Sequence, residues 1–272
     1  MPFRNLLLVI GNNTEASERY ALDLTRLNGA ALTVTTSGAA PSLSAFFRSE
    51  LPSDLLDHMR EDVENTARAA LDAFAERAKQ EGVSVETVMP DLSLGDSSGE
   101  VSRLARYFDG TVLQQPDPAG TETADLIEAV LFRSGRPVVI VPSHQGPLQP
   151  RTVLIAWDEG RPAARAVADA LPLLVIAERV EVVTVGTHGR DRERHSSHLV
   201  RHLARHGIET HGASLVTDRG SVASMLLCHA AEVKADLIVM GGYGHSRLRE
   251  IVLGGTTRRI IQTMTVPVLM AH

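Results

Sequence analysis

The chain has 272 residues, which is long enough for two domains of about 100–150 residues each. Its hydrophobic content of 43%, mean hydropathy of −0.01 and net charge of −6 suit a packed globular protein and argue against a disordered one. One cysteine excludes an internal disulfide, and no apolar run reaches the about 18 residues of a membrane helix, so we expect a soluble, cytoplasmic protein that does not engage a membrane.

Short apolar runs alternate along the chain with longer segments of helical periodicity, which is the pattern of parallel sheets joined by crossover helices. In the first half the predicted strands are NLLLVIG (5–11), ALTVTTSG (31–38), VSVETVMP (83–90), TVLQQP (111–116) and PVVIVP (137–142). In the second half they are TVLIAWD (152–158), VEVVTVGT (180–187), IETHGASLV (208–216), DLIVMGG (236–242) and VPVLMA (266–271). Each half therefore supplies five strands with four helical segments between them.

The two series of strands are two copies of one unit of about 130–140 residues. The linker between them, SHQGPLQP (143–150), is rich in turn formers. We therefore predict an α/β protein with two domains, residues 1–145 and residues 150–272. The first copy carries a long amphipathic helix, at roughly 53–81, that is shorter in the second.

Charge is distributed unequally between the two copies. Residues 1–145 contain 12 basic and 21 acidic side chains, a balance of −9, whereas residues 146–272 contain 15 and 12, a balance of +3. The second half is the better candidate for binding an anion. The alternative is that the two surfaces are solvated and merely carry different charges.

A glycine-rich segment, GGYGHSRLREIVLGGTTRR (241–259), follows the fourth predicted strand of the second half. Gly241 and Gly244 are followed after nine residues by Gly254, and the sequence GTT (255–257) opens the last predicted helix. Glycines let the backbone turn and let a phosphate approach without interference from a Cβ, and successive amides form an anion-binding nest. A helix N-terminus adds unpaired N–H groups and the positive end of a dipole. The segment therefore has the features of a phosphate loop.

Residues 235–272 resemble the C-terminal signature of the universal stress protein (UspA) family, G-x-x-G-x9-G-S/T. Gly241, Gly244 and Gly254 match, while Gly255 occupies the Ser/Thr position and Thr256 follows one residue later. The runs 152–158 and 266–271 resemble the first and last strands of the family. The resemblance covers both halves in architecture and is sharp only in the second. It implies two tandem doubly wound five-stranded parallel sheets of the adenine nucleotide alpha hydrolase-like fold, each with strand order 3-2-1-4-5.

The resemblance also implies that the second half binds ATP or another adenine nucleotide, with or without Mg²⁺. Asp158 is in the position that contacts adenosine, Val185 frames the adenine, and the glycine segment with the last helix holds the phosphates. The implied site residues are Asp158, Val185, Met240, Gly241, Gly244, Arg247, Gly254, Gly255, Thr256 and Thr257. A turn or helix-cap role for Asp158 and plain turn roles for Gly241 and Gly244 are the alternatives.

The first half departs from this pattern and is interpreted as a degenerate copy. Gln114 stands where Gly241 does, Asp125 aligns with Gly255, and the run VIGNN (9–13) lacks the strand-one Asp. A carboxylate beside a phosphate seat would repel the ligand. We therefore predict a structural partner without an ATP site. The final strands of the family often pair, and the two copies can satisfy that need within one chain or in a homodimer.

The helix predicted at 190–206 is basic and rich in histidine. His195, His198, His202 and His206 lie on one stripe, and the i, i+4 spacing of His198 and His202 can chelate zinc. A solvated or subunit-contacting stripe is the alternative, and no aromatic platform accompanies the helix to suggest nucleic-acid binding. Cys228 is predicted as a small core residue.

No catalytic motif is present: the chain has no GKS/T, HExxH or GxSxG sequence. A slow ATPase activity needs no dedicated base and stays open. Two functions remain in play, namely a stress-response protein that binds a nucleotide in its second half and a nucleotide-free stress-response scaffold or interaction protein.

Overall fold

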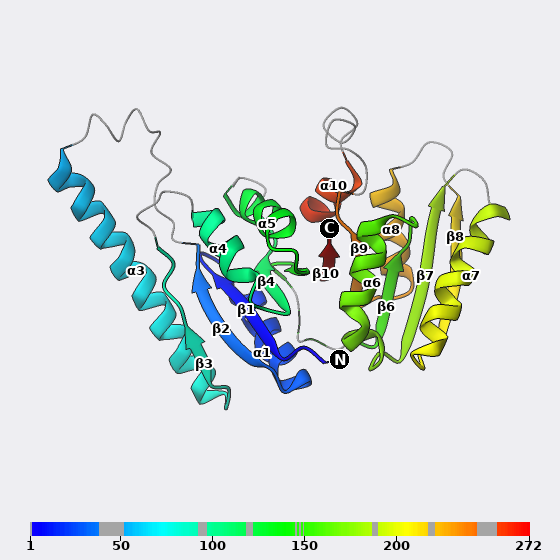
Figure 1. Ribbon diagram of the computed structural model, residues 1–272, viewed down its shortest axis with the longest axis horizontal. Helices are drawn as coiled ribbons and strands as arrows, with labels where there is room; N and C mark the ends of the chain where they lie inside the picture. The colour runs from blue at the N-terminus through cyan, green and yellow to red at the C-terminus, as the bar shows by residue number, and fades with distance from the viewer. Residues whose placement is uncertain are drawn as a thin grey trace.

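In the computed structural model ten strands form one sheet with helices on both faces (Figure 1). The structure describes residues 2–37, 52–91, 97–117, 122–144, 146, 148, 150–186, 190–216, 221–243 and 255–272. Among these residues, no helix has the length and apolar character needed to cross a membrane.

All ten predicted strands are present, and the long helix predicted at 53–81 is observed as α3. The elements of the first half are β1 (Asn5–Ile10), α1 (Glu15–Asn28), β2 (Ala31–Thr36), α3 (Ser53–Gln80), β3 (Val85–Thr87), α4 (Ser97–Ala105), β4 (Gly110–Gln114), α5 (Glu122–Arg133) and β5 (Val138–Val141). Those of the second half are β6 (Thr152–Ala156), α6 (Arg161–Leu174), β7 (Arg179–Gly186), α7 (Arg190–Arg205), β8 (Thr210–Val216), α8 (Val222–Glu232), β9 (Leu237–Gly241), α10 (Thr256–Thr263) and β10 (Val268–Ala271).

The sheet differs from the prediction of two separate five-stranded sheets, although within each half the strands keep the predicted order 3-2-1-4-5. The ten strands form one continuous sheet ordered β3-β2-β1-β4-β5-β10-β9-β6-β7-β8. The two halves join because β5 and β10 pair with each other in antiparallel register, with Val139 opposite Leu269 and Ile140 opposite Val268. The other strand pairs among the described residues are parallel. The expected pairing of the final strands thus occurs within the chain.

The core has two layers, one on each face of the sheet. Leu6, Leu8 and Ile10 of β1 face one layer, and Leu7 and Val9 face the other, because successive side chains of a strand point to opposite faces. Helices α1, α3, α6 and α7 cover the first face, and α4, α5, α8 and α10 cover the second. Each layer contains residues from both halves, so the hydrophobic core is continuous across the β5–β10 seam.

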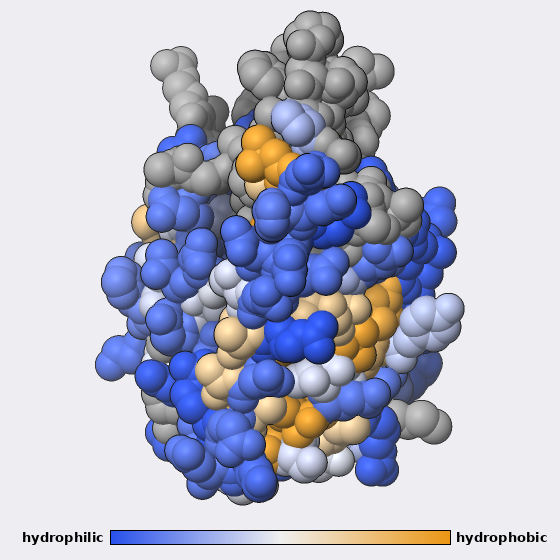
Figure 2. All heavy atoms as spheres, turned by 90° about the vertical axis from the view of Figure 1, so that its left-hand side faces the viewer, coloured by the Kyte–Doolittle hydropathy of each residue, from blue (hydrophilic) through white to orange (hydrophobic). Residues whose placement is uncertain are grey.

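Helix α3 packs along one outer edge of the sheet and is buried mainly in its second part, through Leu71, Phe74 and Ala78. Its first part is largely exposed, including Leu55 at 45%. The surface seen from this side is mostly hydrophilic with small apolar areas (Figure 2).

The prediction that Cys228 is a core residue is wrong, because its side chain is exposed. Helix α8 buries Ala223, Leu226 and Ala230, which are spaced three and four residues apart along one face. Position 228 falls about 200° around the helix from position 226 and therefore points to solvent.

The continuous core and the β5–β10 pairing predict that both halves unfold in one transition. Ile140 is fully buried beside β10, and replacing it with Ala should lower the free energy of unfolding by about 2–5 kcal/mol. Trp157, the sole tryptophan, lies in the other half, so its fluorescence during a urea titration reports whether the loss spreads across the seam. If Ile140→Ala leaves the Trp157 transition in place while Ile155→Ala moves it, the halves unfold independently and the prediction is wrong.

Candidate functional site

The carboxyl ends of β6 and β9 lie side by side in the second half. The two strands pair in parallel with Ala156 opposite Met240. From β6 the chain continues outward to β7, whereas β9 leads on the opposite side to β10. This is the point of an open parallel sheet at which ligands usually bind. Asp158 and Gly241 therefore stand at the two sides of one switch point.

Gly241 allows the first turn of α6 to lie directly against the end of β9. A Cβ at this position would lie 2.5 Å from the backbone nitrogen of Ala163 and 2.8 Å from the carbonyl carbon of Pro162. Both neighbours are backbone atoms of a helix and cannot move aside cheaply. The close approach is therefore a structural requirement for glycine, which holds with or without a ligand.

Asp158 lies in the exposed turn that leads from β6 to α6. Its Oδ1 accepts a hydrogen bond of 2.8 Å from the N–H of Gly160, the residue that precedes the helix. Glu159 between them has a φ of 63°, in the left-handed region. Asp158 therefore has the turn role that was the alternative to ligand binding, and its carboxylate is exposed beside the carboxyl end of β6.

The end of β9 is fixed to the beginning of α10. The backbone N–H of Tyr243 donates to Oγ1 of Thr257 at 3.0 Å, and Thr257 is buried in the first turn of the helix. Gly255 precedes the helix, and both Gly255 and Thr256 are half-buried. The structure therefore brings these residues of the predicted set next to the end of the β-strand that carries Gly241. The predicted Gly244, Arg247 and Gly254 lie outside the described residues.

Two further predicted residues lie on the neighbouring strands. Val185 is half-buried near the carboxyl end of β7, and Met240 is buried in the layer under α8 and α10. Sequence reasoning missed Trp157, which precedes Asp158 and donates its backbone N–H to Val183 at 2.8 Å. Its indole Nε1 is buried without a hydrogen-bond partner among the described residues. A lone tryptophan beside the strand-one Asp was the available signal.

The equivalent place in the first half is filled by a side chain. Gln114 is 6% exposed, and its Oε1 accepts a hydrogen bond of 3.1 Å from the N–H of Ser17, in the first turn of α1. Its Nε2 donates to the carbonyl of Val141 at 3.0 Å and to Oγ of Ser143 at 3.2 Å. Ser17 is the third residue of α1, as Ala163 is the third of α6. The glutamine thus accepts a hydrogen bond from the helix N–H, and its side chain occupies the space at this switch point.

Asp125 lies in the first turn of α5, as its fourth residue, and is exposed. Gly255, with which it was aligned, instead stands immediately before α10. The first-half carboxylate therefore lies deeper in its helix than the alignment suggested.

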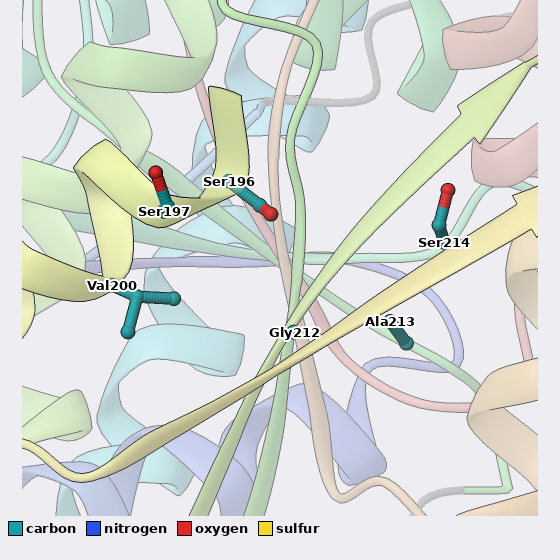
Figure 3. Close-up of a pocket in the computed structure, with 6 residues that line it drawn as sticks. All are labelled: Ser196, Ser197, Val200, Gly212, Ala213 and Ser214. Carbon is teal, nitrogen blue, oxygen red and sulfur yellow. The ribbon is translucent and has the colours of Figure 1, made fainter. Parts of the chain in front are cut away.

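A cavity of about 350 Å³ lies away from this switch point, between α7 and the edge strand β8 (Figure 3). Ser196 is directed from α7 toward β8, where its Oγ is 3.7 Å from the position that a Cβ on Gly212 would take. The cavity is lined by Ser196, Ser197, Val200, Gly212, Ala213 and Ser214. None of the residues predicted for nucleotide binding lines it.

The described histidine side chains of α7 and its C-terminal end do not gather into a metal site with other described ligands. His198, His202 and His206 are exposed, and the rings of His202 and His206 meet edge to face at 4.9 Å. Among the described side chains, no group of three His, Cys, Asp or Glu residues is arranged to hold a metal ion. The side chain of His195 lies outside the description.

A largely buried histidine–glutamate pair joins α8 to β7 in the second half. His229 of α8 places its Nε2 2.7 Å from Oε1 of Glu181, which is only 4% exposed on β7. Arg179 donates to the other oxygen of Glu181 at 2.8 Å. The cluster lies near the amino end of β7, opposite the switch point, and ties α8 to the sheet. A glutamate within the apolar run VEVVTV was the sequence signal for it.

Comparisons with known proteins relate the second half of the chain to one family. Residues 150–272 match the sequence model of the universal stress protein family. A universal stress protein from Synechocystis sp. is 47% identical over 34 residues, a match that covers 12% of either chain.

The structure is similar to that of a universal stress protein from Archaeoglobus fulgidus, with a TM-score of 0.75 and 18% identity over 98% of this chain and 95% of that one. A putative universal stress protein from Pseudomonas aeruginosa gives a TM-score of 0.59 and 17% identity over 98% and 92%. At these identities the structural likeness concerns the fold alone.

The close approach at Gly241 predicts a specific cost for adding one methyl group there. Gly241→Ala should force α6 away from β9 and lower the free energy of unfolding by about 1–3 kcal/mol, measured by urea titration. Gly110→Ala is the matched control, because a Cβ on this buried strand glycine meets its nearest atoms at 3.7 Å. Equal stability of the two variants would contradict this account of Gly241.

Proposed function

Because residues 150–272 form a domain of the universal stress protein family, we propose that this protein is a cytoplasmic stress-response protein that holds ATP or another adenine nucleotide in that domain. The division into a first domain at 1–145 and a second at 150–272 is part of this proposal. The nucleotide serves as a bound ligand whose occupancy signals to partners.

The observation that carries the proposal is the meeting of three features at one switch point. The exposed Asp158, the side-chain-free end of β9 at Gly241 and the first turn of α10 lie at the carboxyl edge of the sheet. A helix N-terminus offers unpaired N–H groups to a phosphate, and an exposed carboxylate can accept hydrogen bonds from ribose hydroxyls. The +3 charge balance of the second half favours a polyanion as well.

Each predicted residue has a role in this arrangement. Asp158 contacts the ribose, and the backbone near Val185 and Met240 borders the adenine. The phosphates lie against the glycine segment and the first turn of α10, where Arg247 and Thr256 add donors and a Mg²⁺ ion can accompany them. No step of bond cleavage is assigned to any residue.

The first half is proposed to bind no nucleotide. Gln114 already satisfies the N–H of Ser17 and occupies the switch point there. The −9 charge balance of that half also disfavours a triphosphate.

A nucleotide-free scaffold is the second candidate, and two observations favour it. The packing of Gly241 against α6 explains that glycine without any ligand. Asp158 is engaged in the turn before α6, and Gly255 supplies no hydroxyl where the family has Ser or Thr.

Calorimetric titration with ATP separates the two candidates. Gly244→Asp should abolish binding, because it adds a Cβ and a negative charge beside the phosphates. Thr256→Ala should weaken binding by about 0.5–1.5 kcal/mol, the value of one neutral hydrogen bond. Thr263→Ala is the control, since this exposed threonine lies at the other end of the same helix and donates to the carbonyl of Arg259. Unchanged binding in Gly244→Asp would mean that the nucleotide binds elsewhere, and no binding by the unmodified protein would favour the scaffold.

The stoichiometry should be one adenine nucleotide per chain. The physical reason is that Gln114 fills the switch point of the first half, so only the second half can receive a ligand. Denaturation of the purified protein in acid, followed by quantification of released nucleotide against chain concentration, gives the ratio. A ratio near two would overturn the proposed inequality of the halves.

A further inference from the structure

The residues that follow β9 are held by the other half of the protein. Tyr243 directly follows the two glycines, and its hydroxyl donates to Oε1 of Glu128 on α5 at 2.6 Å. The ring of Tyr243 lies 4.9 Å from the ring of Phe132, one turn further along the same helix. Two side chains of the first half therefore fix the residue at which the glycine segment leaves the sheet.

Helix α5 also packs closely against Gly242, the residue that precedes Tyr243. A Cβ on Gly242 would lie 2.7 Å from Cδ2 of Leu131, so this glycine lets the strand end pass close to the helix. The N–H of Gly242 donates to the carbonyl of Ala271 at 2.9 Å, and its own carbonyl lies 3.0 Å from Nδ1 of His272. The position of Gly242 is thereby set by α5 on one side and by β10 on the other.

Tyr243 needs such support because its backbone is strained. Its φ of 54° lies in the left-handed region, which a residue with a side chain adopts only at an energetic cost. The hydrogen bond to Glu128 and the contact with Phe132 offset this cost. The same conformation directs the N–H of Tyr243 to Oγ1 of Thr257, which aligns the end of β9 with the start of α10.

The first half also contacts the other end of α10. Gln115 follows β4, and its Nε2 donates to the carbonyl of Ile261 at 3.0 Å and to that of Met264 at 3.3 Å. These carbonyls lie at the C-terminal end of the helix. Contacts from the first half thus reach both the residue bonded to the first turn of α10 and its last turn.

We propose that the first half acts as the positioning platform of the nucleotide site in the second half, with Glu128 and Gln115 as its positioning residues. The inference rests on the proposed function, because it assigns a role in ligand binding to residues that would not touch the ligand. By fixing Tyr243 and α10 in advance, the platform lowers the entropy that a phosphate ligand would otherwise lose in ordering them. The half that binds no nucleotide thereby sets the affinity of the half that does.

The test combines two measurements on the full chain. Hydrogen–deuterium exchange without nucleotide follows the peptides that contain Tyr243 and α10, and calorimetry measures ATP affinity. Glu128→Ala should speed exchange of these peptides and weaken ATP binding by about 2- to 13-fold, the range for one lost hydrogen bond. Tyr243→Phe should weaken it similarly, and the double variant should show no further loss, because both changes remove the same bond.

Two variants separate positioning from general stability. Glu128→Gln keeps an acceptor oxygen for the Tyr243 hydroxyl and should bind ATP within about twofold of the unmodified protein. Val139→Ala removes buried packing at the seam on the face of the sheet opposite to Tyr243 and α10, and should leave ATP affinity unchanged in the folded protein. Gln115→Ala should weaken binding, as Glu128→Ala does.

The outcomes distinguish this inference from the function on which it rests. Unchanged exchange and affinity in Glu128→Ala would overturn the platform, and so would an equal loss of affinity in Val139→Ala. Faster exchange in Glu128→Ala, combined with no ATP binding by the unmodified protein, would support the positioning contact and overturn the proposed function instead.

Discussion

The antiparallel pairing of β5 with β10 is the constraint on which the rest of the structure depends. A final strand with a free edge exposes unpaired N–H and C=O groups and an apolar face, which invites association with other chains. Here each final strand covers the other, so Val139 lies opposite Leu269 in the centre of a ten-stranded sheet. The pairing brings α5 and α10 to the same face beside one seam. The contacts of Tyr243 with Glu128 and of Gln115 with α10 both follow from that placement.

The two halves solve one packing problem in two ways. In each, the end of strand four must meet the first turn of the helix that follows strand one. In the first half the side chain of Gln114 reaches into that turn and accepts the N–H of Ser17. In the second half Gly241 has no side chain, and the helix turn packs so closely that the backbone nitrogen of Ala163 lies 2.5 Å from the position that a Cβ would take. The first half thus fills this position with a buried glutamine whose hydrogen bonds are made, whereas the second half fills it with backbone atoms of α6.

Much of the fold could be predicted from the sequence because its signals are local. The strand NLLLVI is apolar on both faces, as expected for a sheet covered by helices on both sides, and α3 repeats Leu71, Phe74 and Ala78 at helical spacing. The predictions failed where a residue's position depends on contacts between elements of secondary structure.

Helix α8 is apolar on almost all sides, so its periodicity could not predict whether Cys228 is buried or exposed. The bond of His229 to Glu181 requires knowing which helix packs on β7. The union of the two sheets is likewise decided between the halves. At the site, the expected pairing of the strands was enough to predict that Asp158 lies near Gly241. The hydrogen bond of Tyr243 to Glu128 joins residues 115 positions apart, and no sequence pattern indicates it.

Because the two halves belong to one chain and differ in sequence, a contact across the seam can occur on one side only, which is impossible in a symmetric dimer. In a homodimer with a twofold axis, every contact across the seam occurs twice. The strand registers here make Gln114 equivalent to Gly241, since they lie opposite Val141 and Ala271 in their respective halves of the sheet. Tyr243, two residues after Gly241, therefore corresponds to Pro116, two residues after Gln114. Glu128 lies five residues before the end of α5 and corresponds to Arg258, which lies five residues before the end of α10. Proline has no hydroxyl to donate, and arginine has no oxygen to accept with. The Tyr243–Glu128 bond can therefore form once per chain, at the half that keeps the glycine segment, while the other half supplies the residues that support it.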